Sequence, residues 1–301
     1  MRVLVTGGAG YIGYSLVNLL DQNENISEIT VFDNLLRNNT HFFTEGNKLK
    51  KTKFLKGDIL NLYELENAVK DKDIVVHLAA HVEFPYSYQD NYKYEQVNHY
   101  GTVVLYNLLE RFPVEKVIFL SSAAVYGFSE KVTESTPPAP INFYGSSKLQ
   151  AEKYLQLLEN QSNIYLLRSG NVFGYNPMLR LDSVINRFIF DTLVYEKIKI
   201  HGVGNQLRPF ISLATLTQEI LNFITQDRVS GIYNLVEFNQ SMNRIRDYLM
   251  TKNPDLEFAY LNSNQEFKTV SMFSEKLDIT RDIEETIEPV YQQFKESIRL
   301  K

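Results

Sequence analysis

Short hydrophobic runs alternate with longer amphipathic segments along the first 170 residues of the chain. The short runs, such as Val-Leu-Val and Ile-Val-Val, are almost continuously apolar, which is typical of strands covered on both faces. The longer segments repeat apolar residues every three to four positions, as a helix with one buried face does. Because strands and helices alternate, we expect right-handed crossovers and a doubly wound parallel sheet of the α/β class. The predicted strands are Arg2–Thr6, Ile29–Asp33, Lys53–Gly57, Asp73–Ala79, Glu115–Ser121 and Ile164–Ser169, and the predicted helices are Ile12–Gln22, Leu62–Lys70, Tyr92–Arg111 and Tyr144–Asn160.

The alternation becomes less regular after about residue 171. We expect one large sheet domain over residues 1–175, with returning elements around 208–237. A smaller, mixed C-terminal lobe is expected from residues 176–207 and 238–301. The pattern here predicts helices at Ser183–Glu196, Thr215–Gln226, Met242–Met250 and Glu288–Leu300, and strands at Ile198–His201, Pro209–Leu213, Gly231–Val236 and Glu257–Leu261.

Glycines are concentrated directly behind the first predicted strand, in the run Gly-Gly-Ala-Gly-Tyr-Ile-Gly. In a parallel sheet this strand-to-helix turn is where the pyrophosphate of a dinucleotide faces a helix N-terminus. Gly7 allows the tight turn, Gly10 lets the backbone approach the phosphates, and Gly13 lets the helix pack close to the sheet. The turn predicts a Rossmann-type dinucleotide site, although glycines also occur in loops for purely structural reasons.

An acidic residue closes each of the next two predicted strands. Asp33 lies 20 residues past Gly13, where a carboxylate can accept both ribose hydroxyls of an adenosine and would repel a 2'-phosphate. We therefore expect NAD rather than NADP, although Arg37 could attract a 2'-phosphate. The alternative for Asp33 is a cap for the following turn. Asp58 could hold the adenine amino group, or it could cap the helix that starts at Leu62.

The candidate chemistry follows the fifth predicted strand, at Ser122, Tyr144 and Lys148. Ligands of open α/β sheets bind at the carboxyl ends of the strands, so Ser122 faces the expected cofactor crevice. The i, i+4 spacing places Tyr144 and Lys148 on one helical face. With 19 tyrosines in the chain, roughly one Tyr-x-x-x-Lys should occur by accident, so the position of the pair carries more weight than its presence.

Several motifs together resemble the extended short-chain dehydrogenase/reductases, and within them the NAD-dependent sugar-nucleotide epimerase/dehydratase family. The resemblance covers residues 1 to about 237. Its motifs are Thr6-Gly7-Gly8-Ala9-Gly10-Tyr11-Ile12-Gly13, His77-Leu78-Ala79-Ala80, Asn98, Ser122 with Val125-Tyr126-Gly127, and Tyr144-x-x-x-Lys148.

This resemblance implies roles for the candidate residues. Tyr144 would remove a proton from a sugar hydroxyl while the carbon's hydride passes to NAD, and Ser122 would hydrogen-bond the same hydroxyl. Lys148 would hold the nicotinamide ribose and, with the positive nicotinamide ring, lower the pKa of Tyr144 from its ordinary value near 10. The implied cofactor contacts are Gly7, Gly10, Tyr11, Ile12, Gly13, Asp33, Asn34, Asp58, Ile59, Leu78, Ala79, Ala80, Asn98, Ser121, Tyr144 and Lys148. The alternatives are a satisfied strand-end hydroxyl for Ser122 and a helix-surface asparagine for Asn98.

The resemblance also implies contacts to a nucleotide sugar. Substrate-binding residues would be Ser122, Tyr144, Asn171 at the start of the second lobe, and Arg208, whose guanidinium would grip the diphosphate. The alternative for Arg208 is a solvated surface arginine. Arg180 and Arg187 are weaker candidates for the same task. Two departures stand out: Ala214-Thr215 replaces the family's acidic pair, and no C-terminal arginine is obvious, although Lys268 or Arg281 could substitute.

The outcome of the reaction is predicted from the residues behind the catalytic hydroxyl. Sugar-nucleotide 4,6-dehydratases carry Asp-Glu there to move protons at two further carbons, whereas this chain has Ala123-Ala124. We therefore expect a C4 epimerase of a nucleoside-diphosphate hexose, with a UDP-sugar favoured, acting in nucleotide-sugar metabolism and polysaccharide biosynthesis. The alternatives are a 4-keto-sugar reductase, a 2-epimerase, a dehydratase, or a non-catalytic NAD-binding regulator.

The composition of the chain excludes several classes of binding partner and indicates a cellular compartment. The net charge of −5, without a basic block, predicts no nucleic-acid partner, and the chain has no cysteine for disulfides, thiol catalysis or Cys-ligated zinc. We expect no metal site, no membrane span and a cytoplasmic protein. A homodimer is expected through Tyr92–Arg111 and Tyr144–Asn160. The apolar residues that could form its seam, or equally belong to the core, are Leu105, Leu108, Leu109, Leu155, Leu157 and Leu158.

Overall fold

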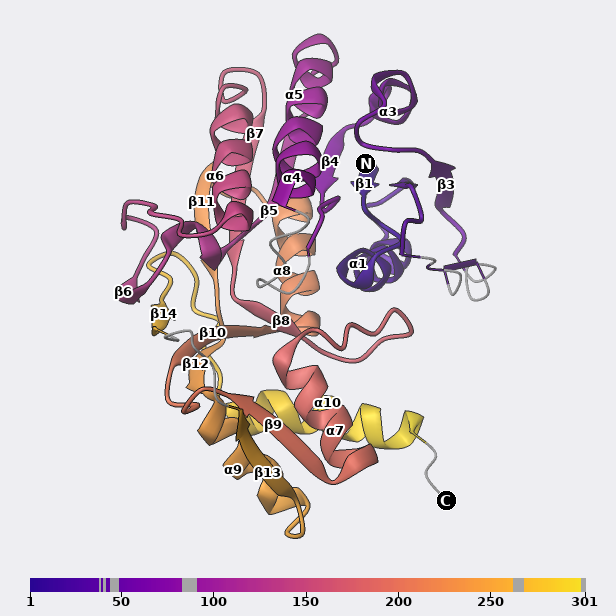
Figure 1. Ribbon diagram of the computed structural model, residues 1–301. Coiled ribbons are helices and arrows are strands. Elements are labelled where there is room, and N and C mark those ends of the chain that lie inside the picture. The colour runs from indigo at the N-terminus through magenta and orange to yellow at the C-terminus, as the bar shows by residue number, and fades with distance from the viewer. Residues whose placement is uncertain (38, 40–41, 44–48, 83–90, 262–267, 299–301) are drawn as a thin grey trace.

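Seven parallel strands form the central sheet of the protein, in the order β11-β7-β5-β4-β1-β2-β3 (Figure 1). A computed structural model describes residues 1–37, 39, 42–43, 49–82, 91–261 and 268–298. The predicted α/β fold with a doubly wound parallel sheet is therefore confirmed. The strands are β1 (Arg2–Thr6), β2 (Glu28–Asp33), β3 (Thr52–Lys56), β4 (Ile74–His77), β5 (Lys116–Ser122), β7 (Asn163–Ser169) and β11 (Gly231–Leu235).

Helices cover both faces of this sheet. Successive side chains of each strand point to opposite faces, and because most of them are apolar, both faces must be covered. Val3 and Val5 pack with α1 (Tyr11–Gln22) and α8 (Leu213–Thr225). Leu4, between them, packs on the other face. The helices of that second face are α3 (Leu62–Val69), α5 (Gly101–Arg111) and α6 (Phe143–Gln156).

The segment predicted as one helix, Tyr92–Arg111, is three pieces. These are the short α4 (Asn91–Lys93), the π-helix η3 (Tyr94–Tyr100) and α5. Asn98 is buried within the π-helix, and Gly101 continues the chain where a Cβ would lie 2.8 Å from Ile59 Cγ2. A π-turn inside an α-helix is frequent at functional sites.

The apolar residues expected at a dimer seam are mostly core. Leu105, Leu108, Leu109, Leu155 and Leu158 are at most 1% exposed, whereas Leu157 is 62% exposed. The homodimer remains a prediction, with less apolar surface on these helices than the sequence suggested.

The C-terminal elements build a second core beside the sheet, around Phe173, Phe210 and Phe294. They lie below the main sheet in Figure 1. Three small sheets take the remaining strands: β8 (Asn171–Phe173) with β10 (Leu207–Ser212) and β12 (Phe238–Ser241), β9 (Lys197–His201) with β13 (Glu257–Leu261), and β6 (Ser129–Val132) with β14 (Val270–Met272). The helices here are α7 (Val184–Tyr195), α9 (Met242–Lys252) and α10 (Ile283–Ser297), and the 3-10 helix η4 (Ala123–Tyr126) follows β5.

Two differences from the predicted elements have local causes. The last helix starts five residues earlier than predicted, because α10 accommodates Pro289 inside it rather than in its first turn. The end predicted at Leu300 lies outside the described residues. Strands β6, β8, β12 and β14 have only three or four residues, too few for a periodic signal.

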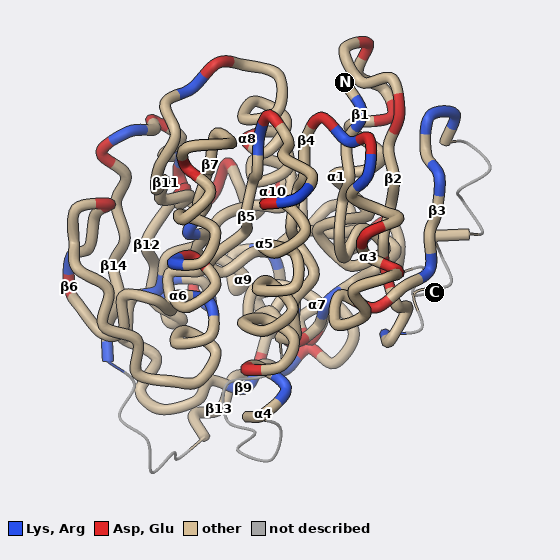
Figure 2. Tube along the Cα trace, turned by 90° about the horizontal axis from the view of Figure 1, so that it is seen from above, with Lys and Arg blue, Asp and Glu red and all other residues tan. Residues whose placement is uncertain are grey.

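Charges of both signs are interspersed along the described chain, without a long stretch of one sign (Figure 2). None of the helices in the described ranges is long and apolar enough to cross a bilayer.

Candidate active site

The glycine turn between β1 and α1 provides a site for an anion. Gly7 has φ 69°, and a Cβ there would lie 2.7 Å from Ala79 N; a Cβ on Gly13 would lie 2.5 Å from Gly7 O. Gly10 is the N-cap of α1, which in this fully described helix has no side-chain cap and no acidic residue in its first turn. The amide groups around Tyr11 and Ile12 therefore remain available for a phosphate group, so the turn fits the pyrophosphate of NAD.

Asp33 lies against this turn at the end of β2. Its Oδ2 accepts a hydrogen bond from Ala9 N (3.1 Å) and its Oδ1 accepts one from Leu35 N (2.8 Å). Burial raises the pKa of Asp33. Each carboxylate oxygen keeps a further lone pair for a ribose hydroxyl, so the expected ribose contact and the turn-capping alternative are compatible.

Asp58, at the end of β3, is paired with Asn34. Its Oδ2 accepts from Asn34 Nδ2 (2.9 Å) and its Oδ1 accepts from Leu60 N (2.9 Å). The helix cap considered for Asp58 is wrong, because the side chain of Asn61 caps α3. The predicted contact between Asp58 and adenine stays a prediction, as does the one for the buried Ile59.

The segment Leu78-Ala79-Ala80 follows β4 and lies next to the glycine turn. Leu78 N donates to Thr6 O (3.0 Å), and Ala79 N donates to the Thr6 hydroxyl (3.3 Å). Gly7, with its Cβ position facing Ala79, needs this close approach. The residues expected around the cofactor from three separate strands are thus neighbours.

Ser122 and Tyr144 meet beyond the end of β5. The Ser122 hydroxyl caps η4 by accepting from Ala124 N (3.2 Å), and it also interacts with the Tyr144 phenol. Tyr144 stands in the first turn of α6, which the side chain of Asn142 caps. Burial raises the pKa of Tyr144, while the charge of Arg180 and the contact with Ser122 act to lower it. The expected fall in this pKa is therefore not reached by the protein alone.

Lys148 is buried one helical turn below Tyr144, with 3% of its surface exposed. Its Nζ donates to Leu120 O (2.9 Å) and lies 4.7 Å from the centre of the Phe119 ring. Burial lowers the pKa of Lys148 to about 7. A buried ammonium with one protein acceptor has donors left for a ligand, as a contact to a ribose requires.

Asn98 is a buried bridge and not the helix-surface residue considered as the alternative. Its Oδ1 accepts from His81 N (2.7 Å), and its Nδ2 donates to His81 O (3.0 Å) and to the Ser147 hydroxyl (3.2 Å). Ser147 in turn donates to Tyr144 O (2.8 Å). The π-helix is thereby tied to the helix that carries Tyr144 and Lys148.

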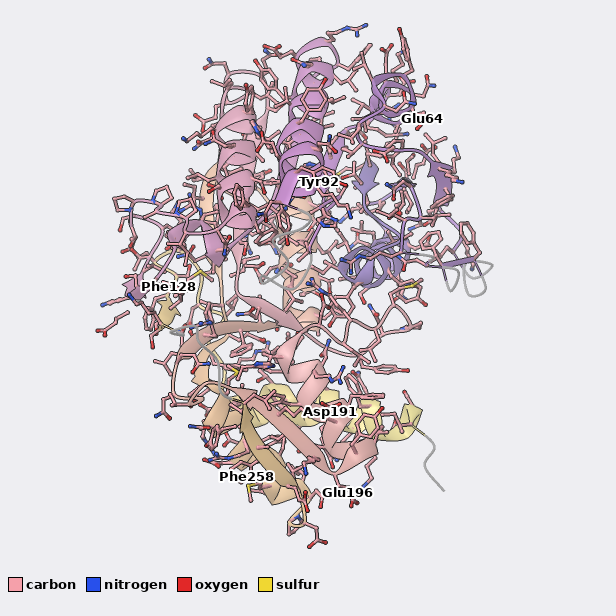
Figure 3. All side chains as sticks on the ribbon, viewed as in Figure 1. Glu64, Tyr92, Phe128, Asp191, Glu196 and Phe258 are labelled. Carbon is pink, nitrogen blue, oxygen red and sulfur yellow. The ribbon has the colours of Figure 1, made fainter. Side chains whose placement is uncertain are left out.

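The expected substrate residues are spread along the β8 and β10 side. Asn171 Nδ2 donates to Pro209 O (3.0 Å), and Arg208 donates from one guanidinium nitrogen to Leu207 O (2.8 Å) and Lys268 O (2.6 Å). Arg187 forms an ion pair on α7 with Asp191 (2.9 Å), the residue labelled on the lower lobe in Figure 3. The assignments of Asn171 and Arg208 to a diphosphate stay predictions.

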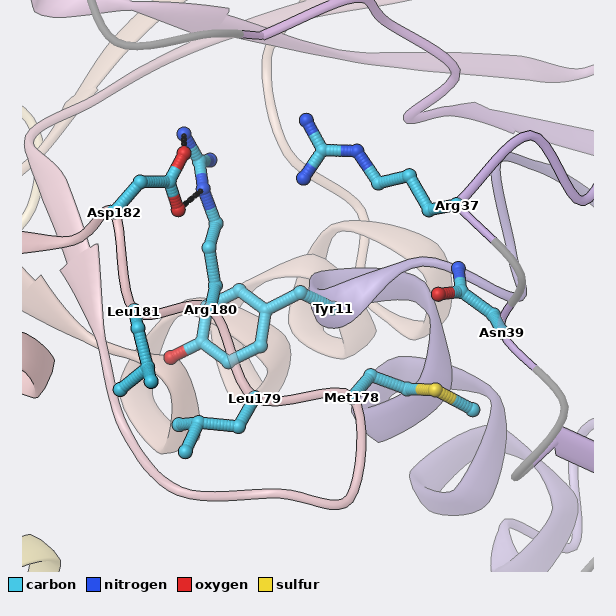
Figure 4. A pocket seen from close by; sticks show the side chains of 8 residues that line it. All are labelled: Tyr11, Arg37, Asn39, Met178, Leu179, Arg180, Leu181 and Asp182. Atoms are coloured by element: carbon cyan, nitrogen blue, oxygen red, sulfur yellow. Dashed lines mark hydrogen bonds and ion pairs between the residues drawn. The ribbon is translucent and has the colours of Figure 1, made fainter.

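Arg180 lines a cavity of about 250 Å³ beside the glycine turn (Figure 4). Its guanidinium makes two hydrogen bonds to Asp182, of 2.6 and 2.9 Å. The loop that carries it is held to α1 because Asn186 donates both to Arg180 O (3.0 Å) and to the Tyr11 hydroxyl (3.2 Å). Arg180 was expected only as a weaker candidate for binding the diphosphate, because its position near Tyr11 and Tyr144 depends on a loop that carries no motif.

A buried acid from elsewhere in the chain lies beside Ala214-Thr215. Glu237 accepts from Ser212 N (2.5 Å), the Ser212 hydroxyl (3.2 Å) and the Thr215 hydroxyl. Its carboxylate therefore holds Ser212, the residue whose own side chain caps α8. No sequence signal connects residues so far apart.

The sheet order, the glycine turn and the Ser122–Tyr144–Lys148 group together define an extended short-chain dehydrogenase/reductase. The family model described as NAD dependent epimerase/dehydratase family matches residues 3–235. The chain belongs to this family, and the expected cofactor, NAD, is confirmed.

Relatives within the family carry more than one activity in their names. The chain is 35% identical over 250 residues to the dTDP-D-glucose 4,6-dehydratase of Bos taurus, covering 78% of this chain and 67% of that protein. It is 32% identical over 222 residues to the UDP-glucose 4-epimerase of Bacillus subtilis (strain 168), covering 70% and 60%. The solved structure of MoeE5 in complex with UDP-glucuronic acid and NAD matches with a TM-score of 0.84 and 25% identity, covering 99% of this chain and 100% of that one.

Proposed function

We propose that the protein is an NAD-dependent epimerase that inverts C4 of a UDP-linked hexose. The observation that carries this proposal is the pairing of Ser122 with Tyr144 at a site where the next two residues, Ala123 and Ala124, have only methyl side chains. A proton can be exchanged at one sugar oxygen here, but these alanines cannot move protons at further carbons. The relative named UDP-glucose 4-epimerase supports the same outcome.

Three groups of residues would bind the cofactor in this proposal. Gly7, Gly10 and Gly13 and the amides of α1 would hold the pyrophosphate of NAD, and Asp33 would hold its adenosine ribose. When bound, NAD supplies the hydride acceptor. Lys148 would donate hydrogen bonds to the second ribose from its buried position.

Tyr144 carries the proton transfer in this proposal. It would take the proton of the sugar 4-hydroxyl as C4 is oxidised. After the 4-keto sugar has rotated in the site, it would return the proton to the same oxygen as the hydride returns to the opposite face of C4. Ser122 donates a hydrogen bond to the same oxygen and steadies the developing carbonyl. The positive charge of Arg180 favours the phenolate form of Tyr144 that this exchange requires.

A dehydratase acting on a dTDP-linked hexose is the second candidate. It is favoured by the names of the mammalian relatives, which are 34 to 35% identical to this chain. It would need proton donors and acceptors at C5 and C6 other than residues 123 and 124. A reductase of 4-keto sugars would differ from both by consuming added cofactor.

The experiment offers UDP-glucose, UDP-galactose, UDP-glucuronic acid and dTDP-glucose to the purified protein without added reductant, and follows the sugars by proton NMR. Interconversion of two UDP-sugars that differ at C4 is expected. A 4-keto-6-deoxy product from dTDP-glucose would establish the dehydratase instead. Turnover of none of the four, in protein shown to carry NAD, would contradict the proposal.

A further inference from the structure

The helical face that carries Tyr144 and Lys148 continues to Glu152, one turn further along α6. Glu152 is 1% exposed, and a carboxylate this deeply buried must be paired to be tolerated. Its two oxygens accept hydrogen bonds from Arg168 of β7, at 3.0 Å from Nε and 2.6 Å from a terminal nitrogen. The hydroxyl of Ser121 on β5 donates to the same carboxylate. Glu152 thus joins one helix to two neighbouring strands.

We propose that Glu152, held in place by Arg168, is a positioning residue of the active site that fixes the end of β5 against α6 and places a negative charge one helical turn from Lys148. The inference deepens the proposed function and rests on it for its catalytic meaning.

The positioning part follows from what stands on either side of Ser121. The preceding residue, Leu120, provides the carbonyl that accepts from Lys148 Nζ at 2.9 Å. The following residue is Ser122, which interacts with Tyr144. The bond from Ser121 to Glu152 therefore anchors β5 between the lysine's acceptor and the catalytic hydroxyl. Arg168 keeps the anchor in one orientation, because its planar fork binds both carboxylate oxygens.

The electrostatic part follows from the groups around Lys148. On α6 the charged group is the Glu152 carboxylate; on β5 the neighbouring groups are the Phe119 ring and the Leu120 carbonyl. His77 on β4 is also near, and burial and the lysine's charge lower its pKa to about 3, so it is neutral. Glu152 acts to raise the pKa of Lys148 against its burial. Arg168 is ion-paired with that carboxylate at 2.6 Å, so a positive charge accompanies Glu152.

The test measures the titration of Lys148 directly, in purified protein with lysine labelled at ¹³Cε. The Lys148 resonance is assigned by its loss in Lys148→Met. Glu152→Gln keeps the shape of the side chain and removes its charge, so the titration midpoint of Lys148 should fall by about half a pH unit or more. Ser121→Ala removes the hydrogen bond but keeps the charge, so the midpoint should stay and the turnover number should fall.

Two further variants keep the test decisive where Glu152→Gln leaves Arg168 unpaired and lowers the yield of folded protein. The double variant Glu152→Met with Arg168→Met replaces the pair by apolar side chains of similar volume, and the Lys148 midpoint should fall by less than in Glu152→Gln. Glu219→Gln breaks a comparable ion pair, between Glu219 on α8 and Arg228 beyond the end of that helix at 3.0 Å, and should leave the midpoint unchanged.

An unchanged midpoint in both Glu152 variants, or an equal shift in Glu219→Gln, would overturn the inference. The NMR readout needs no turnover, so a chain that turned over none of the sugars would defeat the proposed function without deciding the role of Glu152.

Discussion

The two sides of the candidate active site are built by different means. On the side proposed for the cofactor, the glycine turn offers backbone groups at consecutive positions 7–13, and the nearby Asp33 and Leu78–Ala80 lie at the ends of strands of one sheet. On the side proposed for the substrate, Arg180 and Arg208 come from a loop and a strand, and their guanidinium groups already have partners in the chain. The first side depends on local backbone shape, the second on side chains brought together by the fold.

The difference explains which of the candidate functional residues can be recognised from the sequence. A motif of contiguous residues can be recognised because the ligand reads backbone geometry. Side chains that converge from distant positions leave no such pattern, and the contact of Glu237 with Ser212 is an example.

The largest effect is expected from Tyr144→Phe. Loss of the phenol should lower the rate of C4 epimerisation by about 10²- to 10⁴-fold, because the proton transfer loses its group. The retained NAD and the unfolding temperature should stay near the wild-type values. Tyr154→Phe, on the same helix, is the matched control and should retain full activity. A Tyr144→Phe protein with normal turnover would show that the site does not use this phenol.

Gly13→Ala tests the backbone of the cofactor side. The added Cβ would lie 2.5 Å from Gly7 O and Gly8 Cα, which are backbone atoms and cannot move aside cheaply. We expect a loss of about 1–3 kcal/mol of folding free energy, together with loss of retained NAD. Chemical denaturation and release of nucleotide measure the two. Gln22→Ala, at the exposed end of the same helix, should change neither; equal NAD retention in both variants would contradict the tight turn.

Asp33→Asn tests the choice of cofactor. Without the carboxylate, binding of NAD should weaken by about tenfold, because a charged hydrogen bond to the ribose is lost, and NADP should lose less. Titration calorimetry on protein stripped of nucleotide gives both dissociation constants. Asp58→Asn is the comparison on the next strand and should have the smaller effect. A larger effect at Asp58 would reverse the assignment of the two acids.

Arg208→Met tests the substrate side. If the guanidinium binds the diphosphate, KM for the UDP-sugar should rise about tenfold while the retained NAD stays constant. Arg187→Met is the matched control, since Arg187 is half-exposed and already paired with Asp191 on α7. An unchanged KM in Arg208→Met would show that Arg208 does not bind the diphosphate and is a solvated surface arginine.

The smallest effect is expected on thermal stability when the pH is lowered, because this protonates paired carboxylates in both the main sheet and the C-terminal elements. Ion pairs with lysines lower the pKa of Glu28, at the start of β2, and of Glu288, on α10, to about 2. Because both values lie below the ordinary 4.5, their contribution to stability is present above pH 4.5 and is lost as the pH falls toward 2. Glu288→Gln should lower the melting temperature by no more than about 4 °C at pH 7 and flatten its decline in acid. A decline as steep as in the wild type would contradict the role of Glu288.

The elements of the main sheet could be predicted because each carries a complete local signal. Strands such as Arg2–Thr6 are buried on both faces and read as continuous apolar runs. The C-terminal region has weaker signals: its strands β8 and β14 have three residues each, and α10 contains a proline that the pattern associates with a helix start. The π-helix was not predicted either, since its apolar spacing resembles that of an α-helix.

By itself, the sequence determined the parallel sheet, the glycine turn, the acid that follows β2 and the Tyr144–Lys148 spacing, because each is encoded by residues close together in the chain. Only the tertiary structure decided that Arg180 lies near the phenol, that Glu237 binds Ser212 at the start of α8, and that Glu152 is held between Ser121 and Arg168. Those contacts join residues that are 16 to 36 positions apart. Their geometry depends on how helices and loops pack against the finished sheet.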